Sequence, residues 1–376
     1  MTSPVPRCLA CVVMAALAAC GGKADGKKAA DADGAEAKVL NVFNWADYIG
    51  KDTIADFEAK TGIKVTYDTY DSNEVLETKL LTGHTDYDVV VPTQTFAQRM
   101  IKAGVFRKLD KSKLPNLSNM DADIMRRVAA GDPGNEYLIN YMWGTTGIGY
   151  NPQMVRKALG TDRIDSWSAL FDPKVAARLA KCGISLLDAP EDVFDSVRIY
   201  QGHDPNSESP EDLAEAEALL MKVRPYVRYF SSSQHVNDLA SGEICVSLSW
   251  SGLIYQARAR GATAATPVQV TYAIPGEGAD IWFDIVAIPA DAPHPDNAQV
   301  FLNYLMDPKV IAGVSNEIGY ANGNAASLPF VNADLKGDPL VYPPEEVRKR
   351  LYTSIAHTPE FSREQNRAWT RVKTGQ

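Results

Sequence analysis

The chain has 376 residues, of which 45% are hydrophobic and 23% charged, a composition typical of globular proteins. This length exceeds what one simple hydrophobic core supports and predicts two domains or lobes. The formal net charge of -9 disfavours nucleic acid as a partner and is compatible with a cationic ligand.

The N-terminal residues predict export. An apolar run over residues 9–19 follows Arg7 and is too short to span a bilayer, which is typical of a secretory signal peptide at residues 1–19. The run ends in Leu-Ala-Ala-Cys-Gly, which resembles the bacterial lipoprotein box and predicts lipidation of Cys20. The alternative is cleavage for soluble secretion at Ala-Leu-Ala, residues 16–18.

Residues 20–37 have no apolar period and are rich in Gly, Ala, Lys and Asp, so we expect a flexible tether behind the lipidated N-terminus. Only Cys182 and Cys245 then remain in the folded part. An oxidising periplasm allows them to form a disulfide, and two free thiols are the alternative. We therefore expect a periplasmic protein anchored through a lipid at Cys20.

From residue 39 the pattern alternates between strands and helices. Val39–Tyr48 begins as a strand and ends in two large aromatic residues and a carboxylate. The next expected elements are a helix capped by Asp52, a strand at 63–67, a helix at 72–82, a strand at 87–91 and a helix at 93–103. This alternation predicts a parallel sheet, whose strand carboxyl ends are where ligands bind.

Residues 141–151 interrupt the alternation with three glycines and are interpreted as a connection between lobes, since they lack the spacing of a phosphate-binding loop. The α/β pattern then resumes. Expected strands are 182–187, 243–250, 269–274 and 281–289, and expected helices are 190–201, 210–222, 296–306 and 308–317, before a helix-rich tail over 343–376.

No catalytic or metal-binding pattern stands out. The five histidines are scattered and none has the His-x-x-x-His or Glu-x-x-His spacing of a metal site. There is no Gly-x-Ser-x-Gly nucleophile motif either. We therefore expect neither an enzyme, nor a cofactor, nor a metal.

Aromatic residues recur instead beside carboxylates at strand ends. The set is Trp45 with Asp47 and Tyr48, Trp250, Trp282 with Asp284, and Tyr320. Each alone is more typical of core packing, but strand ends can converge on one cleft. Aromatic rings attract cations and carboxylates accept ammonium hydrogen bonds, while methylenes prefer apolar walls. Acidic ends around an aromatic middle predict a polyamine as ligand.

Several motifs closely resemble the putrescine- and spermidine-binding proteins of bacterial ABC polyamine importers, over nearly the whole chain from about Val39. They are Asn44–Ile49, Tyr67–Asp68 with Asp71–Leu76, Val89–Thr93, Thr145–Asn151, Tyr229–Gln234 and Tyr342–Pro344. The resemblance implies an α/β, type II-like periplasmic binding fold in which a ligand cleft lies between two lobes. Approximate lobe bounds are 38–143 with 264–312, and 144–263 with 313–376.

The resemblance also implies residue roles. It implies an aromatic box of Trp45, Trp250, Trp282 and Tyr320, with Tyr48 beside it. It implies Asp284 as the main carboxylate for one ammonium group, Asp47 as a second acidic contact and Thr93 as a hydroxyl contact. It also implies an acidic contact through water from Asp192, which has Glu191 as its neighbour. The family's putrescine-binding members have a disulfide that matches Cys182 and Cys245, which supports the pairing.

Three positions depart from the putrescine-binding pattern. Ala46 replaces a hydroxyl residue, Leu253 replaces an aspartate that pairs with an ammonium group, and Trp282 replaces a phenylalanine as in spermidine binders, although Ala189 is putrescine-like. The expected function is capture of a polyamine, putrescine favoured, for an inner-membrane ABC permease by a monomeric protein. The alternatives are a spermidine or other diamine binder, or a ligand-sensing subunit for a membrane receptor.

Overall fold

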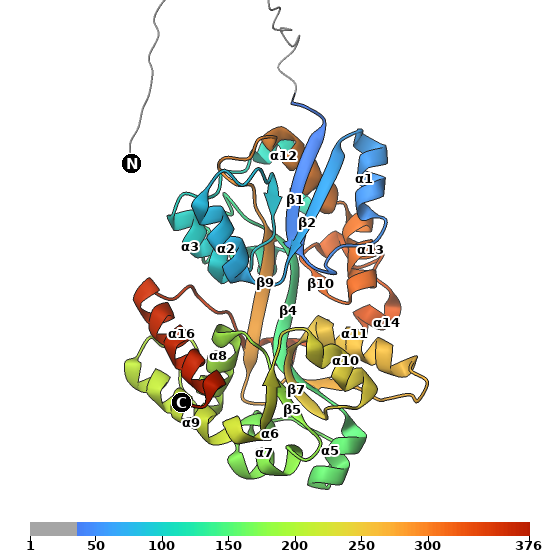
Figure 1. Cartoon of the computed structure of the whole chain (residues 1–376). Helices are drawn as coiled ribbons and strands as arrows, with labels where there is room; N and C mark the ends of the chain where they lie inside the picture. Colours follow the sequence, from blue (N-terminus) through green and yellow to red (C-terminus); the bar gives the residue numbers. More distant parts are fainter. Residues whose placement is uncertain (1–35) are drawn as a thin grey trace, which may run out of the picture. The chain divides into compact units, whose positions relative to one another are not determined.

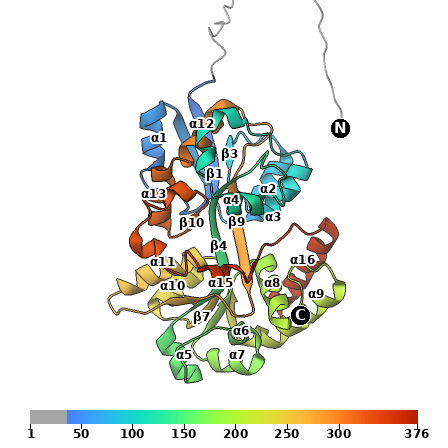
Figure 2. The same cartoon turned by 180° about the vertical axis from the view of Figure 1, so that it is seen from behind.

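The computed structural model describes residues 36–376. The predicted signal peptide at residues 1–19, the predicted lipidation of Cys20 and nearly all of the predicted tether at 20–37 lie outside these residues. Two long strands, β4 (Ile139–Tyr150) and β9 (Ala279–Val286), run antiparallel through the middle of the fold. Figures 1 and 2 show α1, α12 and α13 near one end of this pair and α5 to α9 near the other. The remaining elements are therefore organised around β4 and β9.

A three-stranded parallel sheet follows the sequence prediction. Its order is β2-β1-β3, and its strands are β1 (Val39–Trp45), β2 (Lys64–Tyr70) and β3 (Val89–Val90). Each strand is followed by a helix, in order α1 (Thr53–Thr61), α2 (Asn73–Thr82) and α3 (Gln94–Lys102). The alternation of strands and helices is thus confirmed, but the expected cap by Asp52 is wrong, because its side chain makes no capping hydrogen bond.

Residues 141–150 of the segment interpreted as a connection between lobes belong to β4, a fully buried strand of 12 residues. Its glycines do not make turns, and none has a positive φ. A Cβ at Gly144 would lie 2.4 Å from the Trp282 ring, and one at Gly149 would lie 2.1 Å from Ile254. The glycines therefore leave space for side chains of neighbouring elements.

The second sheet is mixed, with the order β11-β9-β4-β7-β5-β6 and with β8 and β10 also paired to β4. Its other strands are β5 (Ile184–Leu186), β6 (Val227–Phe230), β7 (Val246–Trp250), β8 (Thr271–Ala273), β10 (Ala321–Asn322) and β11 (Leu351–Tyr352). β5 runs parallel to β6 and β7, whereas β4 is antiparallel to β7 and β9. The four strands predicted in this region are all present.

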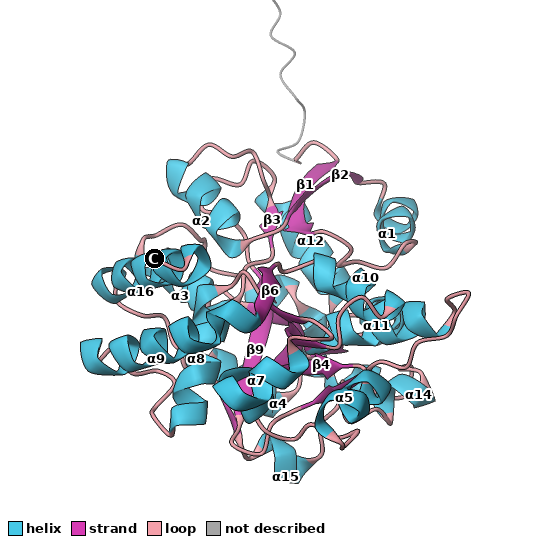
Figure 3. Ribbon diagram, turned by 60° about the horizontal axis from the view of Figure 1, so that its bottom comes forward, coloured by secondary structure: helices cyan, strands magenta, loops and turns pink. Residues whose placement is uncertain are grey.

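The remaining helices lie around the strands of both sheets (Figure 3). They are α4 (Ala122–Val128), α5 (Pro152–Leu159), α6 (Ser168–Phe171), α7 (Pro173–Leu179), α8 (Pro190–Gln201), α9 (Pro210–Val223), α10 (Gln234–Ser241), α11 (Ser251–Ala262), α12 (Pro295–Leu305), α13 (Pro308–Ile318), α14 (Ala333–Lys336), α15 (Glu345–Arg348) and α16 (Pro359–Thr374). α16 packs on α8 and α9. No helix within residues 36–376 is both long and apolar enough to cross a bilayer.

The apolar core forms two clusters. One contains Leu40 and Phe57 with residues of α12 and α13, and the other surrounds Trp167 and Phe194. Trp45 packs against both clusters from the end of β1. The aromatic residue that ends the first strand therefore lies where the two clusters meet.

The structure contains a disulfide between Cys182 and Cys245, which lie just before β5 and β7. Replacing both residues with alanine should lower the free energy of unfolding by about 2 to 5 kcal/mol, because the bond restricts the unfolded chain. Urea denaturation followed by tryptophan fluorescence measures this change. Reduced wild-type protein should denature at the same lowered midpoint, and an unchanged midpoint in both samples would contradict the prediction.

Candidate functional site

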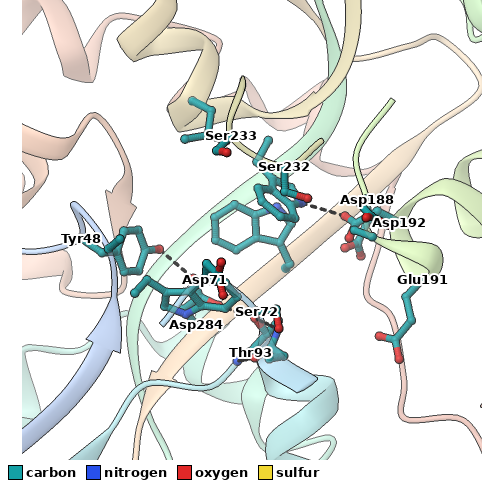
Figure 4. A pocket seen from close by; sticks show the side chains of 18 of the residues that line it. Tyr48, Asp71, Ser72, Thr93, Asp188, Glu191, Asp192, Ser232, Ser233 and Asp284 are labelled. Carbon is teal, nitrogen blue, oxygen red and sulfur yellow. Dashed lines mark hydrogen bonds between the residues drawn. The ribbon is translucent and has the colours of Figure 1, made fainter. Parts of the chain in front are cut away.

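All eleven residues singled out from the sequence line one cavity of about 780 Å³. They are Trp45, Ala46, Asp47, Tyr48, Thr93, Asp192, Trp250, Leu253, Trp282, Asp284 and Tyr320. They come from six separate segments of the chain, so the cavity exists only in the folded protein. Figure 4 shows Tyr48 pointing toward Asp284, with Asp188, Glu191 and Asp192 grouped on the opposite side of the view.

Asp284 is buried on β9 and accepts two hydrogen bonds from hydroxyl groups. Tyr48 donates to Oδ2 at 2.8 Å and Thr93 donates to Oδ1 at 2.7 Å. Burial raises the pKa of Asp284 to about 6, and the two hydrogen bonds oppose this rise because they stabilise the charged form. The carboxylate is therefore mainly ionised at neutral pH.

Thr93 is held in place by Asn73, a residue to which the sequence assigned no role. Asn73 accepts from the Thr93 backbone N–H and donates to the Thr93 hydroxyl, each at 3.0 Å. The Thr93 hydroxyl oxygen is thus occupied as an acceptor, which directs its proton to Asp284. Although Thr93 is the N-cap of α3, its side chain does not cap the helix.

Asp192, near the start of α8, is the second carboxylate of the site and is partly buried. Its Oδ1 accepts from Trp250 Nε1 at 2.9 Å and from Thr146 Oγ1 at 2.7 Å. Burial raises the pKa of Asp192, and these two hydrogen bonds oppose the rise. Within residues 36–376, neither Asp192 nor Asp284 forms an ion pair with a lysine or arginine.

Aromatic rings form the wall between the carboxylates. Tyr320 packs edge-on against Tyr48 and Trp282, with ring centroids 5.3 and 5.5 Å apart. Trp45 is fixed by its own hydrogen bond, from Nε1 to the Val91 carbonyl at 2.9 Å. The four predicted members of the aromatic box are thus brought to one cavity.

Residues at the rim of the cavity are more exposed to solvent than those in its interior. Ala46 and Asp47 are exposed, and Asp47 has a left-handed backbone with φ of 53°. Asp47 thus lines the cavity as a solvated carboxylate, unlike Asp192 and Asp284. Leu253 adds an apolar side chain from α11, a helix that the sequence analysis did not predict.

Glu191 already has a cationic partner in the protein, which it shares with Glu77. Arg99 of α3 approaches its Oε1 at 3.4 Å and also pairs with Glu77 at 3.0 Å. Burial raises the pKa of Glu191 to about 7, while Arg99 opposes the rise. Because α3 and α8 lie on different sides of the cavity, this contact joins the two sides.

The described residues hold no group of three or more His, Cys, Asp or Glu side chains that could bind a metal ion. The site therefore consists of carboxylates, hydroxyl groups and aromatic rings in a cavity of a mixed α/β fold. These features define a protein that binds a small organic solute.

The chain belongs to the family of bacterial extracellular solute-binding proteins, whose model matches residues 52–343. It is 48% identical to the putrescine-binding periplasmic protein SpuD of Pseudomonas aeruginosa, over 93% of this chain and 96% of that protein. It is 49% identical to PotF of Escherichia coli, also a putrescine-binding periplasmic protein, over 91% and 93%. The relatives are periplasmic binding proteins, and the chain is a solute-binding protein rather than an enzyme.

Solved structures confirm the predicted fold class. A putative spermidine/putrescine ABC transporter from Listeria monocytogenes aligns with a TM-score of 0.80 and 29% identity, over 90% of this chain and 100% of that one. The spermidine/putrescine substrate-binding protein PotD of Streptococcus pneumoniae aligns with a TM-score of 0.75 and 26% identity, over 90% and 99%.

Replacing Tyr48 with phenylalanine should raise the pKa of Asp284 above about 6, because it removes a hydrogen bond that stabilises the carboxylate. Carbon-13 NMR of aspartate carboxyl groups in ligand-free protein measures this change. Tyr141→Phe is the matched control, since the Tyr141 hydroxyl donates to the Tyr48 carbonyl and not to Asp284. An unchanged or lower pKa in Tyr48→Phe would contradict the description of the site.

Proposed function

We propose that this solute-binding protein captures a polyamine, with putrescine favoured, and delivers it to an inner-membrane ABC permease. The relatives SpuD and PotF support putrescine as the ligand. The observation that carries the proposal is a pair of carboxylates, the buried Asp284 and the partly buried Asp192, that have aromatic walls between them and no basic partner among the described residues.

A polyamine supplies the positive charge that the carboxylates of this cavity lack. Its amines are protonated at pH 7, because amine pKa values lie near about 10. Buried carboxylates are stabilised by such cations, and rings of Trp and Tyr attract them while covering the methylenes between. We assign one ammonium group to Asp284, with Tyr48 and Thr93 as supporting donors, and a second to the side of Asp192.

Leu253 and Trp282 bear on which polyamine the cavity binds. The putrescine-binding pattern has an aspartate at the position of Leu253, and this aspartate pairs with an ammonium group. Leu253 has no charge, and the loss of such a buried partner costs about 2 to 5 kcal/mol. A micromolar complex has about 8 kcal/mol in total. Asp192 is therefore the carboxylate on which the second ammonium group depends.

We assign the chain to two lobes, approximately 38–143 with 264–312 and 144–263 with 313–376. Two observations refine this assignment. β8 pairs with residues 148–150 of β4, which belong to the second lobe, so we assign β8 to that lobe as well. The chain then returns to the first lobe within β9. Val314 and Ile318 of α13 share a core cluster with Leu40 of β1, so we assign α13 to the first lobe. The chain then passes into the second lobe for the second time after α13.

We further propose that Cys20 carries the lipid and that a monomer reaches the permease on the tether of residues 20–37. The lipoprotein-like sequence around Cys20 supports the anchor. Labelling cells with a fatty-acid analogue tests it, because Cys20→Ser would remove the label if the anchor exists.

Asp284→Asn and Trp250→Ala should each weaken putrescine binding at least tenfold. The first removes the charge that pairs with the ammonium group, and the second removes both a ring and the hydrogen bond that holds Asp192. Isothermal titration calorimetry on protein freed of ligand by unfolding and refolding measures the affinities, and thermal melting checks folding.

Asp188→Asn is the matched control. Asp188 lines the same cavity, but Lys373 and Trp369 already contact its Oδ1, each at 2.9 Å. Its replacement should change the affinity less than threefold. Near-normal affinity in both Asp284→Asn and Trp250→Ala would overturn the site assignment.

A further inference from the structure

A loop of three serines between β6 and α10 forms part of the cavity wall. Ser231, Ser232 and Ser233 all line the cavity, and we call them the serine loop (Figure 4). The backbone N–H of Ser231 donates to the Leu186 carbonyl at 3.0 Å. The Ser231 hydroxyl accepts from the backbone N–H groups of Ser233 and Gln234, at 3.3 and 3.0 Å. The loop is therefore anchored at Ser231.

His235, in the first turn of α10, is fully buried and has no role in the site described above. Its Nδ1 lies 3.2 Å from the Ser231 carbonyl, and its Nε2 lies 2.7 Å from the Ser249 hydroxyl. A carbonyl oxygen only accepts hydrogen bonds, so Nδ1 carries a proton. Burial lowers the pKa of His235 to about 4, although the Ser231 carbonyl and the charge of Asp238 oppose this fall. The ring is therefore neutral near pH 7, and its Nε2 is an acceptor.

Ser249 is the donor to this acceptor. It is fully buried on β7, and its hydroxyl also lies 3.3 Å from the Trp250 carbonyl. A hydroxyl has only one proton to donate, and the contact with His235 is the shorter of the two. The proton of Ser249 therefore lies between its oxygen and Nε2 of His235. One imidazole ring thus joins the serine loop to the end of β7.

The end of β7 carries a central residue of the binding site. The residue after Ser249 is Trp250, which lines the cavity and donates from Nε1 to Asp192 at 2.9 Å. Thr146, opposite Trp250 on β4, donates to the same carboxylate oxygen. Trp250 also directly precedes α11, the helix that carries Leu253. A shift of the end of β7 would therefore move the Trp250 ring and weaken its hydrogen bond to Asp192.

We propose that His235 is a positioning residue for ligand binding, which fixes the serine loop and the Trp250 ring relative to each other through Ser231 and Ser249. His235 does not line the cavity, so it acts on the ligand only through these neighbours. A binding site is precise when the side chains behind it are locked by packing and hydrogen bonds, as His235 is. The effect on ligand affinity rests on the proposed polyamine function, whereas the effect on Trp250 can be measured without ligand.

Ser249→Ala removes the hydroxyl that donates to His235 and changes no residue that lines the cavity. Calorimetry on ligand-free protein should show about fivefold weaker binding of putrescine by this variant. Ser247→Ala is the matched control, because Ser247 is also a fully buried serine of β7 but pairs with Ser185 instead of His235. It should change the affinity less than twofold. Thermal melting checks that both variants fold.

Nitrogen-15 NMR of ligand-free protein tests the same inference without a polyamine. The wild-type signals of His235 should show a proton on Nδ1 and none on Nε2 near pH 7. The indole N–H signal of Trp250 should move in Ser249→Ala and stay in place in Ser247→Ala.

The outcomes separate the two proposals. A proton on Nε2 of wild-type His235, an unmoved Trp250 signal in Ser249→Ala, or an unchanged putrescine affinity in that variant would each overturn the inference and leave the polyamine function intact. If wild-type protein binds no polyamine, the proposed function itself fails, and the NMR signals still decide whether His235 positions Trp250.

Discussion

The carboxylate of Asp284 is buried on β9, where the hydroxyl groups of Tyr48 and Thr93 both donate to it. Burial alone would favour the neutral acid, and the two donors restore the charged form near neutral pH. The three residues come from distant parts of the chain and meet only when β1, α3 and β9 are in place. The negative charge at the centre of the site is therefore a product of the fold.

The central strands make room for the aromatic wall. Gly144 on β4 leaves the space that the Trp282 ring occupies, and a Cβ at Gly252 would lie 2.2 Å from the Tyr320 ring. Small residues thus lie directly behind large rings. A methyl group at either position would displace a ring, so these glycines belong to the binding site although neither lines the cavity.

The sequence predicted the parallel sheet and the aromatic and acidic strand ends because both depend on local patterns. It did not indicate that residues 141–150 form a strand, because glycine is a strong turn signal, and only the packing of Trp282 and Ile254 explains glycines inside a strand. The roles of Asn73 and Thr146 also depend on partners far along the chain. No local pattern could have indicated those partners.

A crystal structure of the protein with putrescine would show whether Asp284 pairs with the ligand. One ammonium group should lie within hydrogen-bond distance of the Asp284 carboxylate, and the methylenes should lie against the rings of Trp250 and Trp282. Putrescine bound elsewhere, or in this cavity without a contact to Asp284, would show that Asp284 is not the carboxylate that binds the ligand.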